Sequence, residues 1–128
     1  MQYKYFYGAQ AEQFSFYRIP KALFTEPNFR ELSTDAKVLY GILLDRMSLS
    51  LKNQWLDAQN KVYIIFTVEE IMDALNCANQ KATRLMVKLE KQAGLIERKR
   101  QGLGRPNLIY VKNFAATIND KSCEKGDS

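Results

Sequence analysis

Two helical signals in close succession, between residues 66 and 94, constrain the fold more than any other feature of the chain. Thr67 and Glu70 have the spacing of a capping box, in which two side chains satisfy free backbone N–H groups at a helix start. Phe66 and Ile71 flank this box at the positions of a hydrophobic staple. We therefore expect a helix that begins at Thr67 and ends at about Asn76.

A further helix is expected almost immediately afterwards. Residues 77–79 form a short turn, and the Asn79 side chain is expected to cap a helix that runs to Ala93. Gly94 then suits the left-handed position at which many helices end. Two helices joined by so short a turn predict a helix-turn-helix motif.

The second of these helices separates its apolar residues from its cations. The apolar residues recur at helical spacing and form one stripe, made of Ala82, Leu85, Met86, Leu89 and Ala93. The cations form a second stripe, made of Lys81, Arg84, Lys88 and Lys91. At about 100° per residue, the centres of the two stripes lie more than roughly 120° apart. The helix is therefore predicted to pack with one side and to present positive charge on the other.

The neighbouring elements extend this motif to a winged helix-turn-helix. Ser33 or Thr34 is expected to cap an earlier helix, whose apolar spacing continues to Met47. Composition and alternation predict strands at residues 14–19 and 61–66, and one helical turn at residues 21–24. Two more strands, residues 95–100 and 108–111, enclose a turn rich in Gly and Pro, which predicts a β-hairpin wing. The expected fold class is α+β, with a three-helix core, a small sheet and the wing.

Three regions are expected along the 128 residues, which suit a single domain with short tails. Residues 14–114 form the winged-helix domain. Residues 1–13 are polar with a cluster of aromatic residues, and they are either a loose terminus or an arm that packs on a partner subunit. Residues 115–128 are small and polar without periodicity, so we expect a linker or a disordered tail.

The positive charge of the chain is concentrated in the last predicted helix and the wing. The whole chain carries +5, whereas residues 79–112 hold nine cations and two acids, which sum to +7. The remainder must then sum to −2. A basic patch of this density indicates a nucleic-acid partner. Tyr110 is the one aromatic residue in this stretch and is expected in a strand core, which favours double-stranded DNA over single strands. An acidic protein partner is a further alternative.

The candidate DNA-binding residues come from the two basic elements. In a helix-turn-helix the first residues of the second helix reach base edges in the major groove, and later residues contact phosphate. Gln80, Lys81 and Arg84 are therefore expected to read bases, and Lys88 to contact phosphate. The full candidate set is Asn79, Gln80, Lys81, Arg84, Lys88, Arg98, Lys99, Arg100 and Arg105.

The cations of the wing cannot all face one groove. Strand alternation sends Arg98 and Arg100 to one face and Lys99 to the other. Arg105 lies at the predicted wing tip, between Gly104 and Pro106, where it is placed to enter an adjacent minor groove.

Catalysis is not expected. The chain has no histidine, which excludes histidine-based nucleophilic and metal sites, and it has no phosphate-binding loop. We therefore predict that the protein is not an enzyme and has no cofactor and no metal. Cys77 and Cys123 have neither metal nor redox spacing and are expected as reduced thiols. No apolar run is long enough to span a membrane and no signal peptide is apparent, so a cytoplasmic protein is expected.

Long strings of the sequence also resemble a known family. Residues 16–24 (FYRIPKALF) and 32–48 (LSTDAKVLYGILLDRMS) are similar to the N-terminal domain of RepA-type plasmid replication initiators of Gram-positive bacteria, the RepA_N family. The similarity continues through residues 60–63, 67–72 and 95–106, and it spans about residues 14–114.

This resemblance implies properties that composition and spacing do not. It implies a winged-helix domain related to DnaD-like replisome organisers, which binds repeated sites (iterons) in a replication origin as a homodimer. It also implies higher assembly on DNA, and a C-terminal region outside this chain that contacts host replication proteins. A winged-helix transcription regulator, or a basic protein–protein interaction module of the replisome, remains the alternative.

Overall fold

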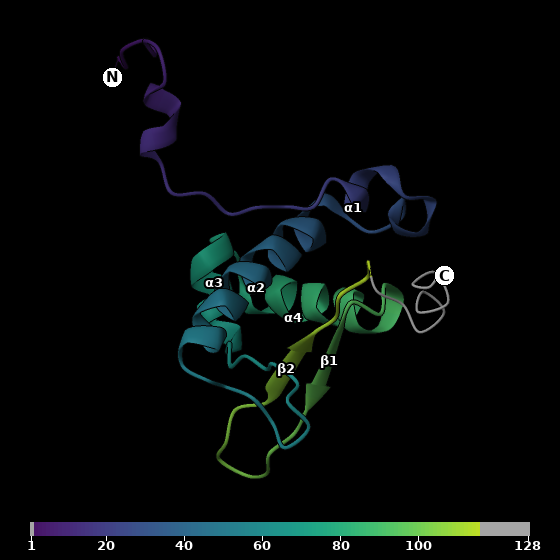
Figure 1. Ribbon diagram of the computed structural model, residues 1–128. Helices are drawn as coiled ribbons and strands as arrows, with labels where there is room; N and C mark the ends of the chain where they lie inside the picture. The colour runs from purple at the N-terminus through teal and green to yellow at the C-terminus, as the bar shows by residue number, and fades with distance from the viewer. Residues whose placement is uncertain (1, 116–128) are drawn as a thin grey trace, which may run out of the picture.

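The computed structural model describes residues 2–115 and shows an α+β winged helix-turn-helix (Figure 1). The elements follow one another in the order η1 (Gln10–Gln13), α1 (Ala22–Thr25), η2 (Pro27–Phe29), α2 (Thr34–Lys52), α3 (Val68–Leu75), α4 (Asn79–Val87), η3 (Lys88–Gln92), β1 (Ile96–Lys99) and β2 (Leu108–Val111). The expected fold class is confirmed. The predicted tail over residues 115–128 lies outside the described residues, apart from Ala115. Within the described part of the chain, no helix is long and apolar enough to cross a membrane.

The core lies where α2, α3, α4 and the hairpin converge. Leu39 and Leu43 of α2, Ile71 of α3, Leu89 of η3 and Ile109 of β2 are all almost completely buried. Burying a side chain of this size is worth about 1.5–3 kcal/mol, and the buried residues of α4 belong to the same cluster. The core therefore fixes α4 and the hairpin relative to each other.

α2 begins where expected but runs longer than its apolar pattern. The Ser33 hydroxyl accepts a hydrogen bond from the Ala36 backbone N–H at 3.3 Å, which confirms a Ser33 cap. The apolar spacing fades after Met47, yet the helix continues to Lys52. Residues 48–52 contain no Gly or Pro, and a helix needs only its backbone hydrogen bonds to continue. The chain leaves the helix near Gln54, which adopts a left-handed φ of 60°.

The helix-turn-helix forms as its local signals predict. Both hydrogen bonds of the Thr67–Glu70 capping box are present, at 2.9 and 3.1 Å. α3 ends at Asn76, which adopts a left-handed φ of 54°. The expected Asn79 cap is wrong, because Ala78 is the N-cap residue and Asn79 is already the first helical residue. A residue inside the helix has helical backbone angles, so its side chain no longer reaches back to the first free N–H groups.

The predicted helix over residues 79–93 changes its winding part-way. After Val87 the chain continues as a π-helical turn, η3, and the Ala93 N–H donates to the Lys88 carbonyl at 3.0 Å. Gly94 follows with φ 67°, which confirms the expected left-handed end. π-Helical turns are rare in proteins, and those that occur are often found at functional sites.

The hairpin is confirmed, whereas the strand expected at residues 61–66 is reduced to isolated bridges. β1 and β2 pair antiparallel, with Arg98 opposite Ile109. Ile64 exchanges two backbone hydrogen bonds with Ile109, at 2.8 and 2.9 Å. Pairing does not extend, because the Tyr63 N–H turns to the Trp55 carbonyl at 3.2 Å. One residue therefore pairs with β2 where a strand was expected.

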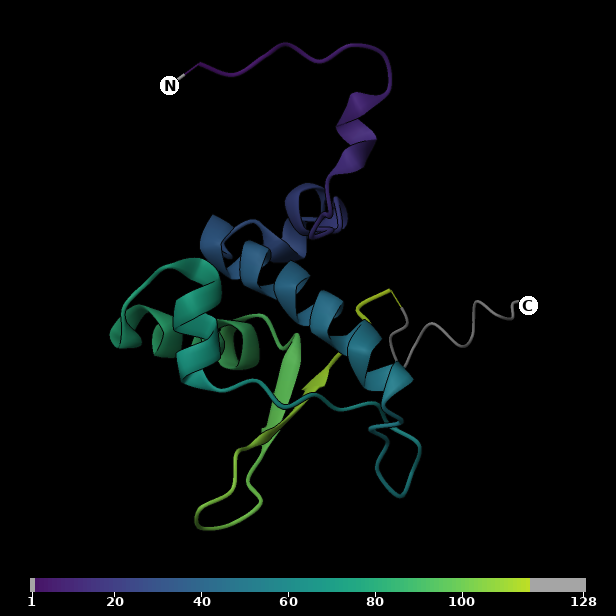
Figure 2. The ribbon, with the colours of Figure 1, turned by 90° about the vertical axis from the view of Figure 1, so that its left-hand side faces the viewer.

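The strand expected at residues 14–19 is also absent from the described residues. The segment is extended, but it lies apart from the sheet and pairs with no strand there (Figures 1 and 2). It instead crosses α2 at Gly41. A Cβ at Gly41 would lie 2.9 Å from both the Arg18 carbonyl oxygen and Ile19 Cγ1. Only glycine lets this segment approach α2 so closely, so Gly41 allows residues 18–19 to pack directly on the helix.

Candidate nucleic-acid interface

α4 buries one face and exposes the other. Its buried residues are Ala82, Leu85 and Met86, followed by Leu89 in η3. Its exposed residues are Asn79, Gln80, Thr83, Arg84 and Val87, followed by Lys91 and Gln92 in η3, where Lys88 is half-buried. A helix that packs with one side leaves the opposite side free to enter a groove of matching width, and the major groove of B-DNA has that width. The predicted division of this helix into a packed side and a cationic side is confirmed for Arg84.

Lys81 lies at the edge of this face, where it is paired. Its ammonium nitrogen is 2.7 Å from Asp35 Oδ2, in the first turn of α2. The hydrogen bond from Lys81 lowers the pKa of the Asp35 carboxyl group. Both side chains remain 40–45% exposed, so this is a surface ion pair that contributes little stability. Its effect is on geometry, because it holds Lys81 toward α2 and away from the centre of the exposed face.

Arg98 is paired with Glu90, and this pair is less exposed than the Lys81–Asp35 pair. Its guanidinium donates two hydrogen bonds to Glu90 Oε1, at 2.9 and 2.7 Å, and its backbone N–H donates to Glu90 Oε2 at 3.4 Å. The two side chains are only 25% and 19% exposed. Burial raises the pKa of Glu90, but the hydrogen bonds and charge of Arg98 outweigh burial and leave the pKa lowered. Arg98 thus joins β1 to η3, the helical turn that follows α4, and ties the wing to that end of the helix-turn-helix.

We predict that Glu90→Gln destabilises the domain by about 1–2 kcal/mol at neutral pH, since it removes the charge from a half-buried, hydrogen-bonded pair. The folded-state pKa of Glu90 lies below its ordinary value of 4.5. The stabilisation by the charged Glu90 is therefore complete above about pH 4.5, the ordinary pKa, and it is lost as the pH falls through the lower folded-state pKa. Urea unfolding at pH 7 and pH 3 should show a difference between wild type and variant at pH 7 that shrinks at pH 3.

Glu97→Gln is the matched control, because Glu97 lies on the same hairpin but is exposed on its other face. We expect Glu97→Gln to change stability by less than about 0.5 kcal/mol at either pH. Equal losses in the two variants would contradict a structural role for the Arg98–Glu90 pair.

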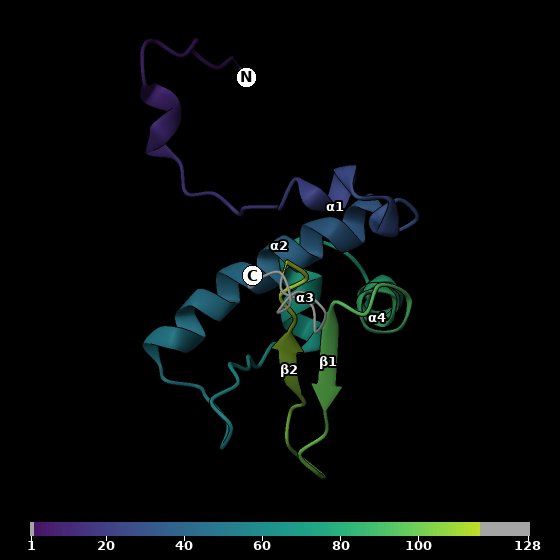
Figure 3. The same ribbon diagram turned by 45° about the vertical axis from the view of Figure 1, so that its right-hand side comes forward.

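The wing carries the remaining candidate cations. Lys99, Arg100 and Arg105 are exposed, as is the whole tip over residues 101–107. The tip is closed by a hydrogen bond from the Arg105 N–H to the Gly102 carbonyl at 3.2 Å, and by one from Gln101 Nε2 to the Pro106 carbonyl at 2.8 Å. The hairpin extends below the helices, and α4 and the C-terminal end of α2 lie on opposite sides of it (Figures 2 and 3).

One side of the wing lies against the helix-turn-helix. Arg98 and Arg105 line one shallow hollow together with Thr67 at the start of α3 and Met86 of α4. Residues from the two predicted DNA-binding elements therefore lie side by side. A duplex that met α4 would also meet the cations of the wing, as the predicted order of elements requires.

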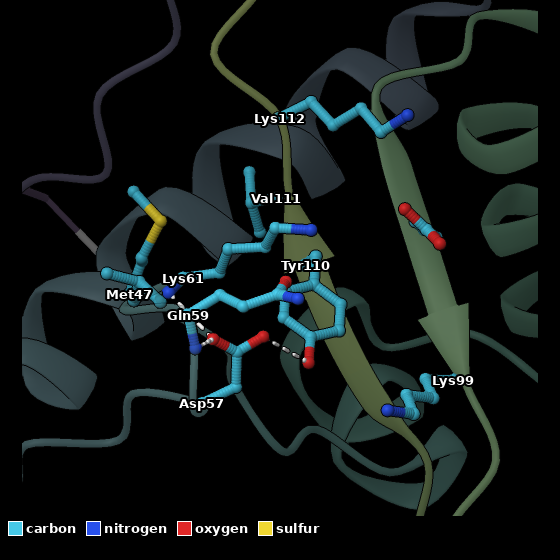
Figure 4. Close-up of a pocket in the computed structure, with 10 residues that line it drawn as sticks. Met47, Asp57, Gln59, Lys61, Lys99, Tyr110, Val111 and Lys112 are labelled. Atoms are coloured by element: carbon cyan, nitrogen blue, oxygen red, sulfur yellow. Dashed lines mark hydrogen bonds between the residues drawn. The ribbon is translucent and has the colours of Figure 1, made fainter.

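The outer face of the hairpin shows how the wing is supported (Figure 4). The Tyr110 hydroxyl donates to Asp57 Oδ2 at 3.1 Å, and Asp57 Oδ1 accepts the backbone N–H groups of Gln59 and Lys61 at 2.8 and 2.9 Å. Partial burial and the Asp57 carboxylate raise the pKa of Tyr110. Tyr110 shares this face with Lys99 and not with the core, so its expected place in a strand core is wrong. The expected separation of Arg98 from Lys99 is confirmed, because the strand register places them on opposite faces.

The interface also contains two residues that sequence reasoning missed. Thr83 and Val87 are exposed on α4, next to Gln80 and Arg84. Neither carries charge, so the pattern of cations along the helix does not include them. A helical wheel centred on the buried stripe finds both, since it ranks residues by direction and not by type.

Sequence comparison identifies the family to which this fold and surface belong. The profile described as "Replication initiator protein A (RepA) N-terminus", RepA_N, matches residues 15–125. The chain belongs to the RepA_N family. The resemblance inferred from residues 16–24 and 32–48 is thereby confirmed, and it covers most of the chain.

Solved structures agree with the RepA_N assignment. The "N-Terminal domain of DNA binding protein" is 37% identical with a TM-score of 0.73, and the alignment covers 99% of this chain and 98% of that one. A "Rep-DNA complex" is also 37% identical with a TM-score of 0.73, and 98% of each chain is covered. An "MDR initiator" is 38% identical with a TM-score of 0.70, over 98% of this chain and 99% of that one.

A curated relative is much longer than the region that matches this chain. A "41 kDa protein" from Lactobacillus helveticus is 32% identical over 103 residues, which cover 80% of this chain. The match spans 28% of the length of that relative.

Proposed function

We propose that this RepA_N domain binds double-stranded DNA at repeated sites of a plasmid replication origin. α4 enters the major groove, where Gln80 and Arg84 read bases, and the wing places Arg105 on the adjacent minor groove or backbone. The single observation that carries the proposal is the exposed face of α4, which presents Gln80 and Arg84 beside a wing with three exposed cations. The solved relative in complex with DNA supports it. We further propose that the domain has no catalytic activity and needs no cofactor.

Footprinting on the plasmid that encodes the protein tests this proposal. Protection of a tandem repeat within the origin is the expected result. Protection confined to a promoter would favour the transcription regulator. Absence of any protection, together with binding to an acidic replisome protein, would favour the protein–protein interaction module.

We propose that the arm over residues 1–13 forms a homodimer. Tyr3, Tyr5, Phe6 and Tyr7 are 60–85% exposed. The Phe6 and Phe14 rings meet edge to face with centroids 6.0 Å apart, so part of the arm has a defined shape. Exposed aromatic clusters of this kind are typical of protein interfaces. A dimer would match two half-sites on DNA, and several dimers on repeats would build the higher assembly.

Removal of residues 1–13 is expected to convert a dimer to a monomer in sedimentation equilibrium. A second variant keeps the arm length and replaces Tyr3, Tyr5, Phe6 and Tyr7 with alanine. It should have the same effect, because the aromatic rings supply the buried surface. An unchanged mass in both variants would show that the arm is not part of the dimer interface.

We propose that contacts with host replication proteins lie outside this domain, in the additional length that the relative from Lactobacillus helveticus has.

A further inference from the structure

We infer that Val87 is a specificity-determining residue that reads the 5-methyl group of thymine in the major groove. This inference rests on the proposed function and adds an apolar readout to it. Val87 is 40% exposed although it is apolar and β-branched. It is the last residue of α4, immediately before the π-helical turn.

The position of Val87 on the helix is the first step of the argument. At about 100° per residue, Val87 points within roughly 20° of Gln80 and 60° of Arg84. The centre of the buried stripe, formed by Ala82, Leu85, Met86 and Leu89, lies on the opposite side of the helix. Val87 is therefore closer to the middle of the exposed face than Lys81, which turns to Asp35. If Gln80 and Arg84 face the floor of a groove, Val87 faces it as well.

The chemistry of Val87 limits what it contacts there. A valine side chain has no donor or acceptor, so it offers nothing to phosphate oxygens or to the polar base edges. The thymine 5-methyl group is the apolar group that bases present in the major groove. The stiff χ1 torsion of valine also means that little side-chain entropy is lost when it is fixed against a base. The match between residue and ligand is thus specific to a methyl group.

The spacing along α4 places this contact relative to the others. Seven residues separate Val87 from Gln80, which corresponds to about 10 Å along the helix axis. That distance is roughly three base pairs of B-DNA. We therefore expect the thymine to lie about three base pairs from the base that Gln80 reads, on the side toward the C-terminal end of α4.

The experiment replaces thymine with deoxyuridine, which pairs identically and lacks only the methyl group. The probe is a duplex that the wild-type protein protects or selects from random sequence, with each thymine replaced in turn. At one or two positions the wild type should bind about 3–10-fold more weakly. Val87→Ala should bind the thymine duplex more weakly by a similar factor and should be insensitive to deoxyuridine at the same positions.

Leu49→Ala is the matched control, since Leu49 is a 45% exposed aliphatic residue on α2. It should keep the full sensitivity of the wild type to deoxyuridine. Circular dichroism of Val87→Ala should match the wild type, because alanine favours helix and Val87 is outside the core. Uniform binding of the wild type to every deoxyuridine duplex would overturn the inference, as would full sensitivity in Val87→Ala. Both results leave specific DNA binding intact, whereas a lack of preference for any duplex would overturn the proposed function and the inference with it.

Discussion

An increase in salt from about 50 to about 200 mM is expected to weaken binding of each domain to duplex DNA by roughly 10²-fold. Cations that neutralise phosphates release condensed counterions, and higher salt lowers the free energy gained from that release. The expected slope of log K against log salt is roughly −4 per subunit, which corresponds to about four phosphate contacts. A dimer bound to two half-sites should show about twice this slope.

The number of contacts follows from which candidate cations the fold leaves free. Five of them, Arg84, Lys88, Lys99, Arg100 and Arg105, have no ion pair within the described residues, and all but Arg84 are expected to contact phosphate. Arg98 is held by Glu90, and Lys81 is held by Asp35. Arg84 is expected to bind a base in the major groove and is therefore not counted among the phosphate contacts. If all seven candidate cations contacted phosphate, the slope would be steeper than the one expected here.

Lys88→Ala tests the origin of the slope. It should reduce the magnitude of the slope by about 1 and weaken binding to all sequences equally, as expected for a phosphate contact. Lys52→Ala removes one charge from the C-terminal end of α2, on the other side of the hairpin from α4 (Figure 3). It should leave the slope unchanged. A slope near zero for the wild type would contradict the electrostatic part of the proposed function.

The elements that the sequence predicted well are those fixed by neighbouring residues. The Thr67–Glu70 box, the left-handed Gly94 and the apolar stripe of α4 each depend on residues within a few turns of one another. Such signals can be recognised in the sequence because backbone hydrogen bonds and side-chain directions repeat with the helical period. The order of helix, turn, helix and hairpin then follows with little freedom.

Several of the features that the sequence did not predict depend on contacts between distant segments. The strand expected at residues 61–66 is limited to two isolated bridges, and only Ile64 among these residues pairs with the hairpin, at Ile109. The pairing of Lys81 with Asp35 joins α4 to α2, 46 positions earlier in the chain. Such pairs appear only once the elements are packed. This is why the candidate set drawn from the sequence contained two cations, Lys81 and Arg98, that the fold holds in ion pairs with Asp35 and Glu90.

Arg84→Ala is expected to weaken binding to the specific duplex by about 1–3 kcal/mol, or roughly 5–150-fold, and to relax discrimination at one base pair. Arg84 is exposed on α4, and no ion pair within the described residues holds it. Its guanidinium can therefore donate two parallel hydrogen bonds to guanine O6 and N7. Quantitative binding to the protected site and to its single-base variants measures both effects.

Arg84→Lys separates base reading from charge. Lysine keeps the positive charge but lacks the planar fork that matches two acceptors at once. We therefore expect Arg84→Lys to retain most binding to random duplex DNA while it loses discrimination at the same base pair as Arg84→Ala. If both variants instead lost the same factor on specific and random DNA, Arg84 would be a phosphate contact. Arg84 would then position the domain on DNA without reading a base, and only Gln80 and the wing would read bases.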